Sequence, residues 1–283
     1  MDMVSSFYDS NKEDRDVILE YNNIPLNEVK PYDICGVPVW NFTMAEAIAQ
    51  ITALIEKGGV YHFISLDPYK LYKIKTDKSL KFIKDSAEGE VKNFATGAGV
   101  LWASKTLGSP LPETIPFFSF LMELIRLAEA KEYPLFFMGS KNEIVEKAFN
   151  NLKKSFPNLK IIGRHGGYFL SQREEDIVEA MRKSEPKIVF VGLGFPREDK
   201  WIQRIKVCFK NTIFISIGGS LDVISGQMKK APDFFINRNL AWFYRIIIRP
   251  WRIGRFLGVL FFFFLVLLTK FFQKIKTILP LKN

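Results

Sequence analysis

Short apolar runs alternate with segments of helical apolar spacing along most of the chain. Strand-like runs, rich in β-branched and aromatic residues, occupy residues 33–40, 61–66, 91–95, 134–138, 159–164, 187–191 and 212–217. Helical spacing occupies residues 43–57, a segment from Pro68, and residues 100–105, 117–131, 142–155, 172–183 and 239–248, with Thr43 as an N-cap. This order predicts an α/β fold: a mostly parallel, Rossmann-like sheet flanked by helices.

The stretch 187–222 is central to this pattern. A buried strand runs into the turn Gly192-Leu193-Gly194-Phe195-Pro196, a helix follows, and the next strand runs into Gly218-Gly219. The stretch therefore reads as a βαβ unit with a glycine turn at the carboxyl end of each strand. Ligands of open parallel sheets bind at those ends, so we expect the functional site there.

The alternation stops near Pro232. Residues 256–268 are thirteen positions without a charged or strongly polar side chain, flanked by Arg and Lys. A helix of that length covers about 20 Å, against roughly 30 Å of hydrocarbon in a bilayer. We expect a helix embedded in the membrane interface; a full span or a buried core helix are the alternatives. The domains are then a polar lead-in (1–30), an α/β domain (31–232) and a basic, hydrophobic helical appendage (233–283).

The net charge of +10 comes entirely from the tail. Residues 1–228 are neutral overall, whereas residues 229–283 hold eleven basic residues and the single acid Asp233. The partner could be nucleic acid, anionic lipid or a diphosphate ligand. Nucleic acid is disfavoured because the tail aromatics form one apolar block. The two Cys and two His lack metal-ligand spacing, and Arg197 replaces the third glycine of a dinucleotide fingerprint, so neither a metal nor another cofactor is expected.

Three late stretches together resemble a known family. They are GLGFPREDKWI (192–202), IGGSLDVISGQMKKAP (217–232) and NLAWFYRIIIRPWRIGR (239–255), and GRHGGYF (163–169) and FFMGS (136–140) match further upstream. The pattern is similar to that of the WecG/TagA/CpsF glycosyltransferases, whose usual forms are close to GxGxPKQExWI, GVGGxFDxxxGxxxRAP and LEWxYRxxxEPxR. The resemblance covers about residues 33–255.

The resemblance implies a sugar transferase of bacterial cell-surface polysaccharide synthesis on the cytoplasmic face of the membrane. Such enzymes move a hexose or N-acetylhexosamine from a UDP-sugar to a polyprenyl-diphosphate-linked saccharide, without a metal. The sequence leaves a homo-oligomer open. The substrate-binding residues then expected are Gly97, Gly99, Gly192, Gly194, Pro196, Arg197, Glu198, Gly218, Gly219 and Asp222. The arginines expected to bind the diphosphate and lipid headgroup are Arg245, Arg249, Arg252 and Arg255.

The first half departs from the family pattern. The family's TxNP turn reads Ser65-Leu66-Asp67-Pro68, and Thr96 stands where the family has its proposed catalytic aspartate. Residues 113–119 lack both the Arg and the Asp of the family's RxxGxD stretch. A threonine cannot serve as a base near neutral pH.

Two hypotheses follow from these departures. In the first, the protein is an active transferase whose base is Asp67, with Ser65 and Thr96 binding sugar or acceptor hydroxyls. In the second, it is a catalytically lapsed family member that binds a nucleotide-sugar or serves as a partner of another protein.

Overall fold

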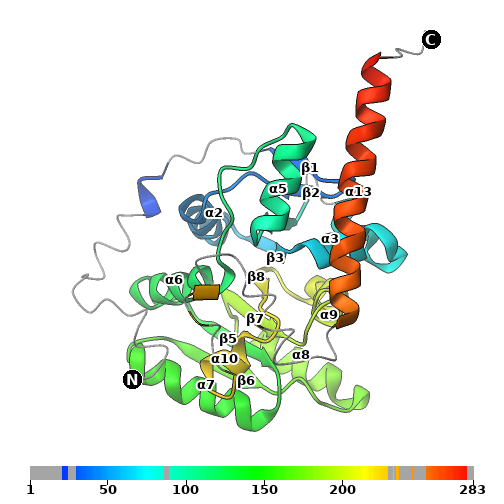
Figure 1. Cartoon of the computed structure of the whole chain (residues 1–283). Helices are drawn as coiled ribbons and strands as arrows, with labels where there is room; N and C mark the ends of the chain where they lie inside the picture. Colours follow the sequence, from blue (N-terminus) through cyan, green and yellow to red (C-terminus); the bar gives the residue numbers. More distant parts are fainter. Residues whose placement is uncertain are drawn as a thin grey trace.

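The computed structural model describes residues 21–24, 30–85, 89–228, 232, 234–235, 244 and 253–278. One eight-stranded sheet runs through these residues, and every neighbouring pair is parallel except β1 with β2. In spatial order the strands are β1 (Pro31–Asp33), β2 (Pro38–Trp40), β4 (Val91–Ala95), β3 (Gly59–Leu66), β8 (Asn211–Ser216), β7 (Ile188–Gly192), β5 (Leu135–Gly139) and β6 (Ile161–His165). The predicted α/β fold with a mostly parallel sheet is confirmed (Figure 1).

Helices cover both faces of this sheet. They are α2 (Met44–Lys57), α3 (Pro68–Thr76), α4 (Lys81–Lys84), α5 (Ala98–Leu107), α6 (Phe117–Ala130), α7 (Asn142–Ser155), α8 (Glu174–Lys183), α9 (Arg197–Ile205), α10 (Ser220–Ile224) and α13 (Ile253–Ile278). Short 3-10 turns are η2 (Lys78–Leu80), η3 (Ser171–Arg173) and η4 (Lys206–Cys208). Apart from Tyr244, the predicted helix 239–248 lies outside the described residues, and the turn from η2 into α4 was not predicted.

The alternation of side chains along the strands explains why both faces are covered. Phe63, Phe190 and Ile215 point into a core shared with α2, α6 and α7. Their neighbours point the other way: Ile64 packs with α3, α5 and α13, and Val191 packs with α8 and α9. Strands that are apolar on both sides are typical of a parallel sheet between two helical layers.

Local sequence sets several element boundaries. Thr43 caps α2 as predicted, because its hydroxyl accepts from the Glu46 N–H and the Glu46 carboxylate accepts from the Thr43 N–H at 2.8 Å. Residues 33–40, predicted as a first strand or a hairpin arm, belong to the antiparallel hairpin β1–β2. Its turn has positive φ at Cys35 and Gly36, which breaks a continuous strand.

The C-terminal helix α13 is longer than the apolar stretch that predicted it. It has 26 residues, hence a length of about 39 Å. Gly258, Phe262 and Val266, spaced four apart, are buried against α3 and α5. A Cβ at Gly258 would lie only 2.8 Å from the Tyr69 ring, so glycine lets α13 approach α3 closely.

The rest of α13 is exposed and apolar. Its exposed large side chains are Leu257, Leu260, Phe261, Phe264, Leu267, Leu268, Phe271 and Phe272. The segment Gly254–Ile275, with mean hydropathy 2.1, is long and apolar enough to cross a membrane by length and composition alone. In Figure 1 its C-terminal part extends beyond the other helices. The helix is therefore neither a buried core helix nor detached from the α/β domain.

The packing of α13 predicts that replacing Phe262 or Phe264 will change the stability of the protein by very different amounts. Phe262 is 1% exposed and Phe264 is 61% exposed. Phe262→Ala leaves a cavity against α3 and α5 and should lower the free energy of unfolding by about 3 kcal/mol. Phe264→Ala should change it by less than about 0.5 kcal/mol. Chemical denaturation in mild detergent measures both, and equal effects would contradict this docking of α13.

Candidate active site

The carboxyl ends of the parallel strands bring most of the predicted site residues to one edge of the sheet. In the strand register Leu66 lies beside Ala95, and Gly139 lies beside Gly192. The segments that follow these positions start at Asp67, Thr96, Ser140 and Leu193, and β8 leads into Gly218 at the same edge. The turns expected to hold the site are therefore neighbours in space as well as in the motif pattern.

Asp67 is the N-cap of α3. Its Oδ1 accepts a hydrogen bond of 2.7 Å from the Lys70 N–H, and Pro68 occupies the first helical turn. The Thr96 N–H donates to the Leu66 carbonyl at 2.8 Å, which holds the two turns together. Ser65 is only 8% exposed, just inside the strand end. Asp67 therefore has a structural role whether or not it also acts as a base.

The glycines of the next turn have different roles. Gly97 begins α5 with a φ of 85°, and a Cβ there would meet nothing within 4 Å. A Cβ at Gly99 would lie 2.6 Å from Pro68 Cγ and 3.2 Å from Phe263 Cζ. Gly99 thus allows α5 to pack tightly against α3 and α13, and the structure supplies this reason for a glycine that was assigned to substrate binding.

Glu198 connects the two central glycine turns. Its Oε2 accepts hydrogen bonds of 3.0 Å from both the Gly194 N–H and the Gly218 N–H. The side chain is fully buried, and its Oε1 has no partner among the described residues. Burial, with the adjacent Asp199 charge, raises the pKa of Glu198 to about 8. This geometry makes Glu198 a link between turns.

Asp199 belongs to a second buried network, which joins α9 to β3 and β8. Ser216 Oγ donates to Asp199 Oδ1 at 2.7 Å, and His62 Nε2 lies 2.8 Å from Ser216 Oγ. Burial lowers the pKa of His62, so its ring is neutral. Burial opposes ionisation of Asp199, yet hydrogen bonds from His62 and Ser216 and the Lys70 charge hold its pKa below the ordinary value. His62 and Asp199 lie inside the protein beneath the site.

Lys70 was not identified from the sequence. Its Nζ lies 5.3 Å from the centroid of the Phe195 ring, so a cation from α3 covers the β7–α9 turn. Tyr69 packs edge-on against the same ring at 6.4 Å, and the Arg255 guanidinium lies 5.4 Å from the Tyr69 ring centroid. A continuous row of contacts thus leads from α13 to the glycine turn. Arg245, Arg249 and Arg252 lie outside the described residues.

Asp222 of α10 contacts the turn that follows β5. It accepts a 2.7 Å hydrogen bond from Ser140 Oγ, which follows β5. Arg197 Nη2 donates to the Gly167 carbonyl at 3.2 Å, and its guanidinium lies 6.0 Å from the ring centroid of Tyr168, which is 73% exposed. Ser140 and Tyr168 belong to the motifs FFMGS and GRHGGYF, which gave no role from sequence alone.

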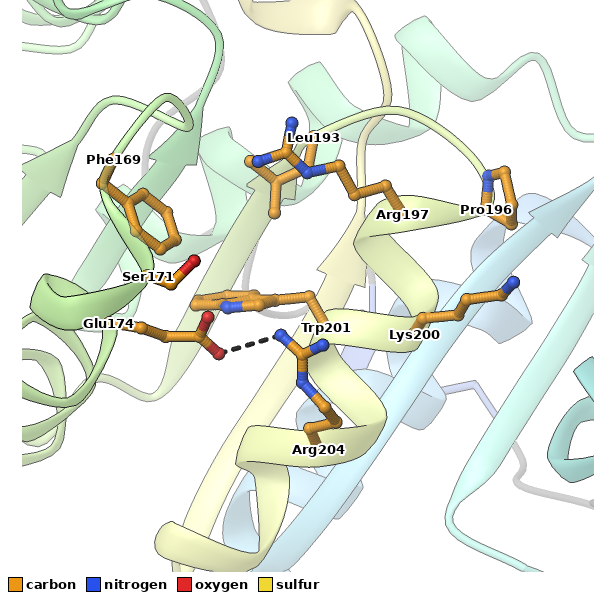
Figure 2. Close-up of a pocket in the computed structure, with 9 residues that line it drawn as sticks. All are labelled: Phe169, Ser171, Glu174, Leu193, Pro196, Arg197, Lys200, Trp201 and Arg204. Carbon is orange, nitrogen blue, oxygen red and sulfur yellow. Dashed lines mark hydrogen bonds and ion pairs between the residues drawn. The ribbon is translucent and has the colours of Figure 1, made fainter. Parts of the chain in front are cut away.

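A cavity of about 350 Å³ lies beside α9, away from most of the predicted site residues. Its lining is Phe169, Ser171, Glu174, Leu193, Pro196, Arg197, Lys200, Trp201 and Arg204. Figure 2 shows Arg204 paired with Glu174 at 2.9 Å below the Trp201 indole, and Arg197 on the other side of that ring. Only Pro196 and Arg197 belong to both this cavity and the predicted site.

Comparison with known proteins gives one consistent result. The profile described as "Glycosyl transferase WecG/TagA/CpsF family" matches residues 32–276. An N-acetylglucosaminyldiphosphoundecaprenol N-acetyl-beta-D-mannosaminyltransferase of Staphylococcus aureus is 30% identical over 246 residues, covering 86% of this chain and 94% of that protein. A protein of the same name from Bacillus spizizenii is 34% identical over 163 residues, covering 58% of this chain and 63% of its own.

The capping role of Asp67 can be separated from any role in chemistry. Asp67→Ala removes the acceptor for the Lys70 N–H and should lower the free energy of unfolding by about 1 kcal/mol. Asp67→Asn keeps a side-chain oxygen, and asparagine caps helices about as well as aspartate, so it should leave stability nearly unchanged. Thermal and urea denaturation of the two variants measure this. If Asp67→Asn lowered the free energy of unfolding as much as Asp67→Ala does, asparagine would not replace aspartate as the cap of α3.

Proposed function

The chain belongs to the WecG/TagA/CpsF family of glycosyl transferases, and from this we propose that it transfers a hexose or N-acetylhexosamine from a UDP-sugar to a polyprenyl-diphosphate-linked saccharide. The two relatives named above support this, because their names specify an N-acetylmannosaminyl group and a diphosphoundecaprenol-linked acceptor. Cell-surface polysaccharide synthesis is the setting that this chemistry implies.

One structural observation supports the proposal most strongly. The Asp67 turn, both glycine turns and the first turns of α13 meet at one sheet edge, through the contacts of Lys70 with Phe195 and of Arg255 with Tyr69. A soluble nucleotide-sugar and a lipid-linked acceptor must meet in such a place, where a parallel-sheet ligand site adjoins a hydrophobic element.

The reaction needs a base and a cationic environment for the leaving group. The acceptor hydroxyl oxygen attacks the anomeric carbon, the carbon–oxygen bond to the diphosphate breaks, and UDP departs with the electron pair. We assign the hydroxyl proton to the Asp67 carboxylate, which has a second oxygen besides the one that caps α3. Lys70, which covers the Phe195 ring of the β7–α9 turn, and Arg197, which contacts the Gly167 carbonyl, would stabilise the departing diphosphate.

The exposed face of α13 suggests where the enzyme works. Eight large apolar side chains face outward along it, while Arg255 at its start faces the catalytic edge. We place this face in an anionic membrane, with the α/β domain on the cytoplasmic side, where nucleotide-sugars are available. The acceptor headgroup would then approach the edge along α13.

Release of UDP tests the proposal. Wild-type protein in detergent is given a panel of UDP-N-acetylhexosamines and UDP-hexoses, with and without a polyprenyl-diphosphate-linked saccharide. We expect release that depends on the acceptor, with one donor clearly preferred. Asp67→Asn should lower kcat by about 100-fold or more, because it removes the base and keeps the cap. Turnover by Asp67→Asn at the wild-type rate would exclude Asp67 as the base.

The alternative, a catalytically lapsed family member, also has an observation in its favour. By the motif resemblance Thr96 stands where the family pattern has an acid, and Asp67 is already hydrogen-bonded as a helix cap. A wild-type protein that binds UDP without turnover, and a Thr96→Asp variant that gains acceptor-dependent turnover, would establish this alternative. The variants Asp67→Asn and Thr96→Asp therefore distinguish the two hypotheses.

Lys70 is expected to matter for the leaving group. Lys70→Ala should lower kcat/KM by roughly 100-fold, because a cation close to the developing negative charge stabilises the transition state. Lys70→Arg keeps the charge and the contact with Phe195 and should recover much of this loss. Lys200→Ala is the matched control, since Lys200 pairs with Asp77, the residue after α3, at 3.4 Å. Steady-state kinetics with the preferred donor measure all three.

A further inference from the structure

We propose that Glu198 is a positioning residue that holds the two glycine turns together as a neutral carboxylic acid. The role as a link between turns needs no substrate to be present. The consequence for nucleotide binding, given below, rests on the proposed function. One buried side chain thereby fixes the distance between turns that belong to different βα units.

Two hydrogen bonds to one oxygen of Glu198 join the glycine turns. A single atom, Oε2, accepts from the Gly194 N–H and from the Gly218 N–H, both at 3.0 Å. Gly194 and Gly218 have φ values of 83° and 53°, conformations that favour glycine. The two turns therefore have their conformation set by glycine and their separation set by Glu198.

The second oxygen of Glu198, Oε1, and the neighbouring Asp199 bear on the protonation state of Glu198. Oε1 is buried and has no partner among the described residues, so it receives none of the donors that usually accompany a buried carboxylate. The adjacent Asp199 on α9 accepts a hydrogen bond from Ser216 of β8 at Oδ1, which also lies 3.5 Å from His62 Nε2 of β3, while its Oδ2, like Glu198 Oε1, has no partner among the described residues. Ionised Glu198 would put a second buried negative charge beside it, against the single Lys70 amine on α3.

A neutral acid explains what the link can do for binding. Like an amide, it offers an oxygen to the two backbone N–H groups, and it places no negative charge beneath the turns. A diphosphate bound above Gly194 and Gly218 would be repelled by an ionised Glu198.

Infrared spectroscopy tests the protonation state without reference to activity. The difference spectrum of wild type minus Glu198→Gln at pH 7 should contain the C=O stretch of a protonated carboxylic acid. A difference spectrum with only carboxylate bands would overturn the proposal. Asp222→Asn is the matched control, because Asp222 is a partly buried carboxylate of the same edge with a hydroxyl partner.

The pH dependence of stability gives an independent answer. Because the pKa of folded Glu198 lies above its ordinary value near 4.5, its contribution to stability is complete below that value and is lost as the pH rises to about 8. The melting temperature of wild type should therefore fall relative to that of Glu198→Gln across this range and then level off. A difference that is constant, or a wild-type melting temperature that rises relative to that of Glu198→Gln as the pH increases, would contradict a neutral acid.

Binding of UDP links this inference to function. Calorimetric titration should show that the wild-type Kd rises as the pH passes 8, and that Glu198→Gln shows a smaller rise. Glu198→Ala leaves both turn N–H groups without their acceptor and should weaken UDP binding more than Glu198→Gln does. Equal weakening by the two variants would contradict the positioning role. If wild type binds no UDP, the proposed function fails, while the infrared and stability results still decide the protonation state.

Discussion

Burying the neighbouring carboxyl groups of Glu198 and Asp199 costs solvation free energy, and the surrounding backbone is arranged to offset that cost. Asp199 Oδ1 accepts from a hydroxyl of β8 and lies 3.5 Å from an imidazole of β3, and Glu198 Oε2 accepts from two backbone N–H groups of the glycine turns. Both carboxyl groups lie in the first turn of α9, where the helix dipole favours the negative charge of Asp199. Together they fix α9 relative to β3, to β8 and to both turns.

This constraint also explains how the site keeps its shape. The turns after β7 and β8 are built from glycines and could adopt many conformations if nothing held them. Glu198 joins them from below, Lys70 covers Phe195 from α3, and Asp222 is held by Ser140. The edge that receives the nucleotide in our proposal is therefore fixed in the absence of ligand, which lowers the ordering cost of binding. The docking of α13 on α3 extends this edge toward a lipid.

Much of the architecture could be predicted from the sequence, because the determinants are local or periodic. Apolar runs ending in glycine turns identified the parallel strands, Thr43 was recognised as a cap, and the motifs 192–202 and 217–232 gave a family that the profile match confirms. The roles of Glu198 and Lys70 could not be predicted, because they depend on contacts between turns distant in the chain. The docked face of α13 was also hidden, since Phe262 is buried and Phe264 exposed within four consecutive phenylalanines.

In our proposal the nucleotide binds over the two turns joined by Glu198. Hydrogen–deuterium exchange of the full chain in detergent, with and without UDP, tests this most directly. With UDP bound, we expect slower exchange at residues 193–198 and 217–222 and little change at the hairpin β1–β2. Protection confined to α8 and the outer side of α9, around the cavity of Trp201 and Arg204, would contradict it and move the nucleotide site there.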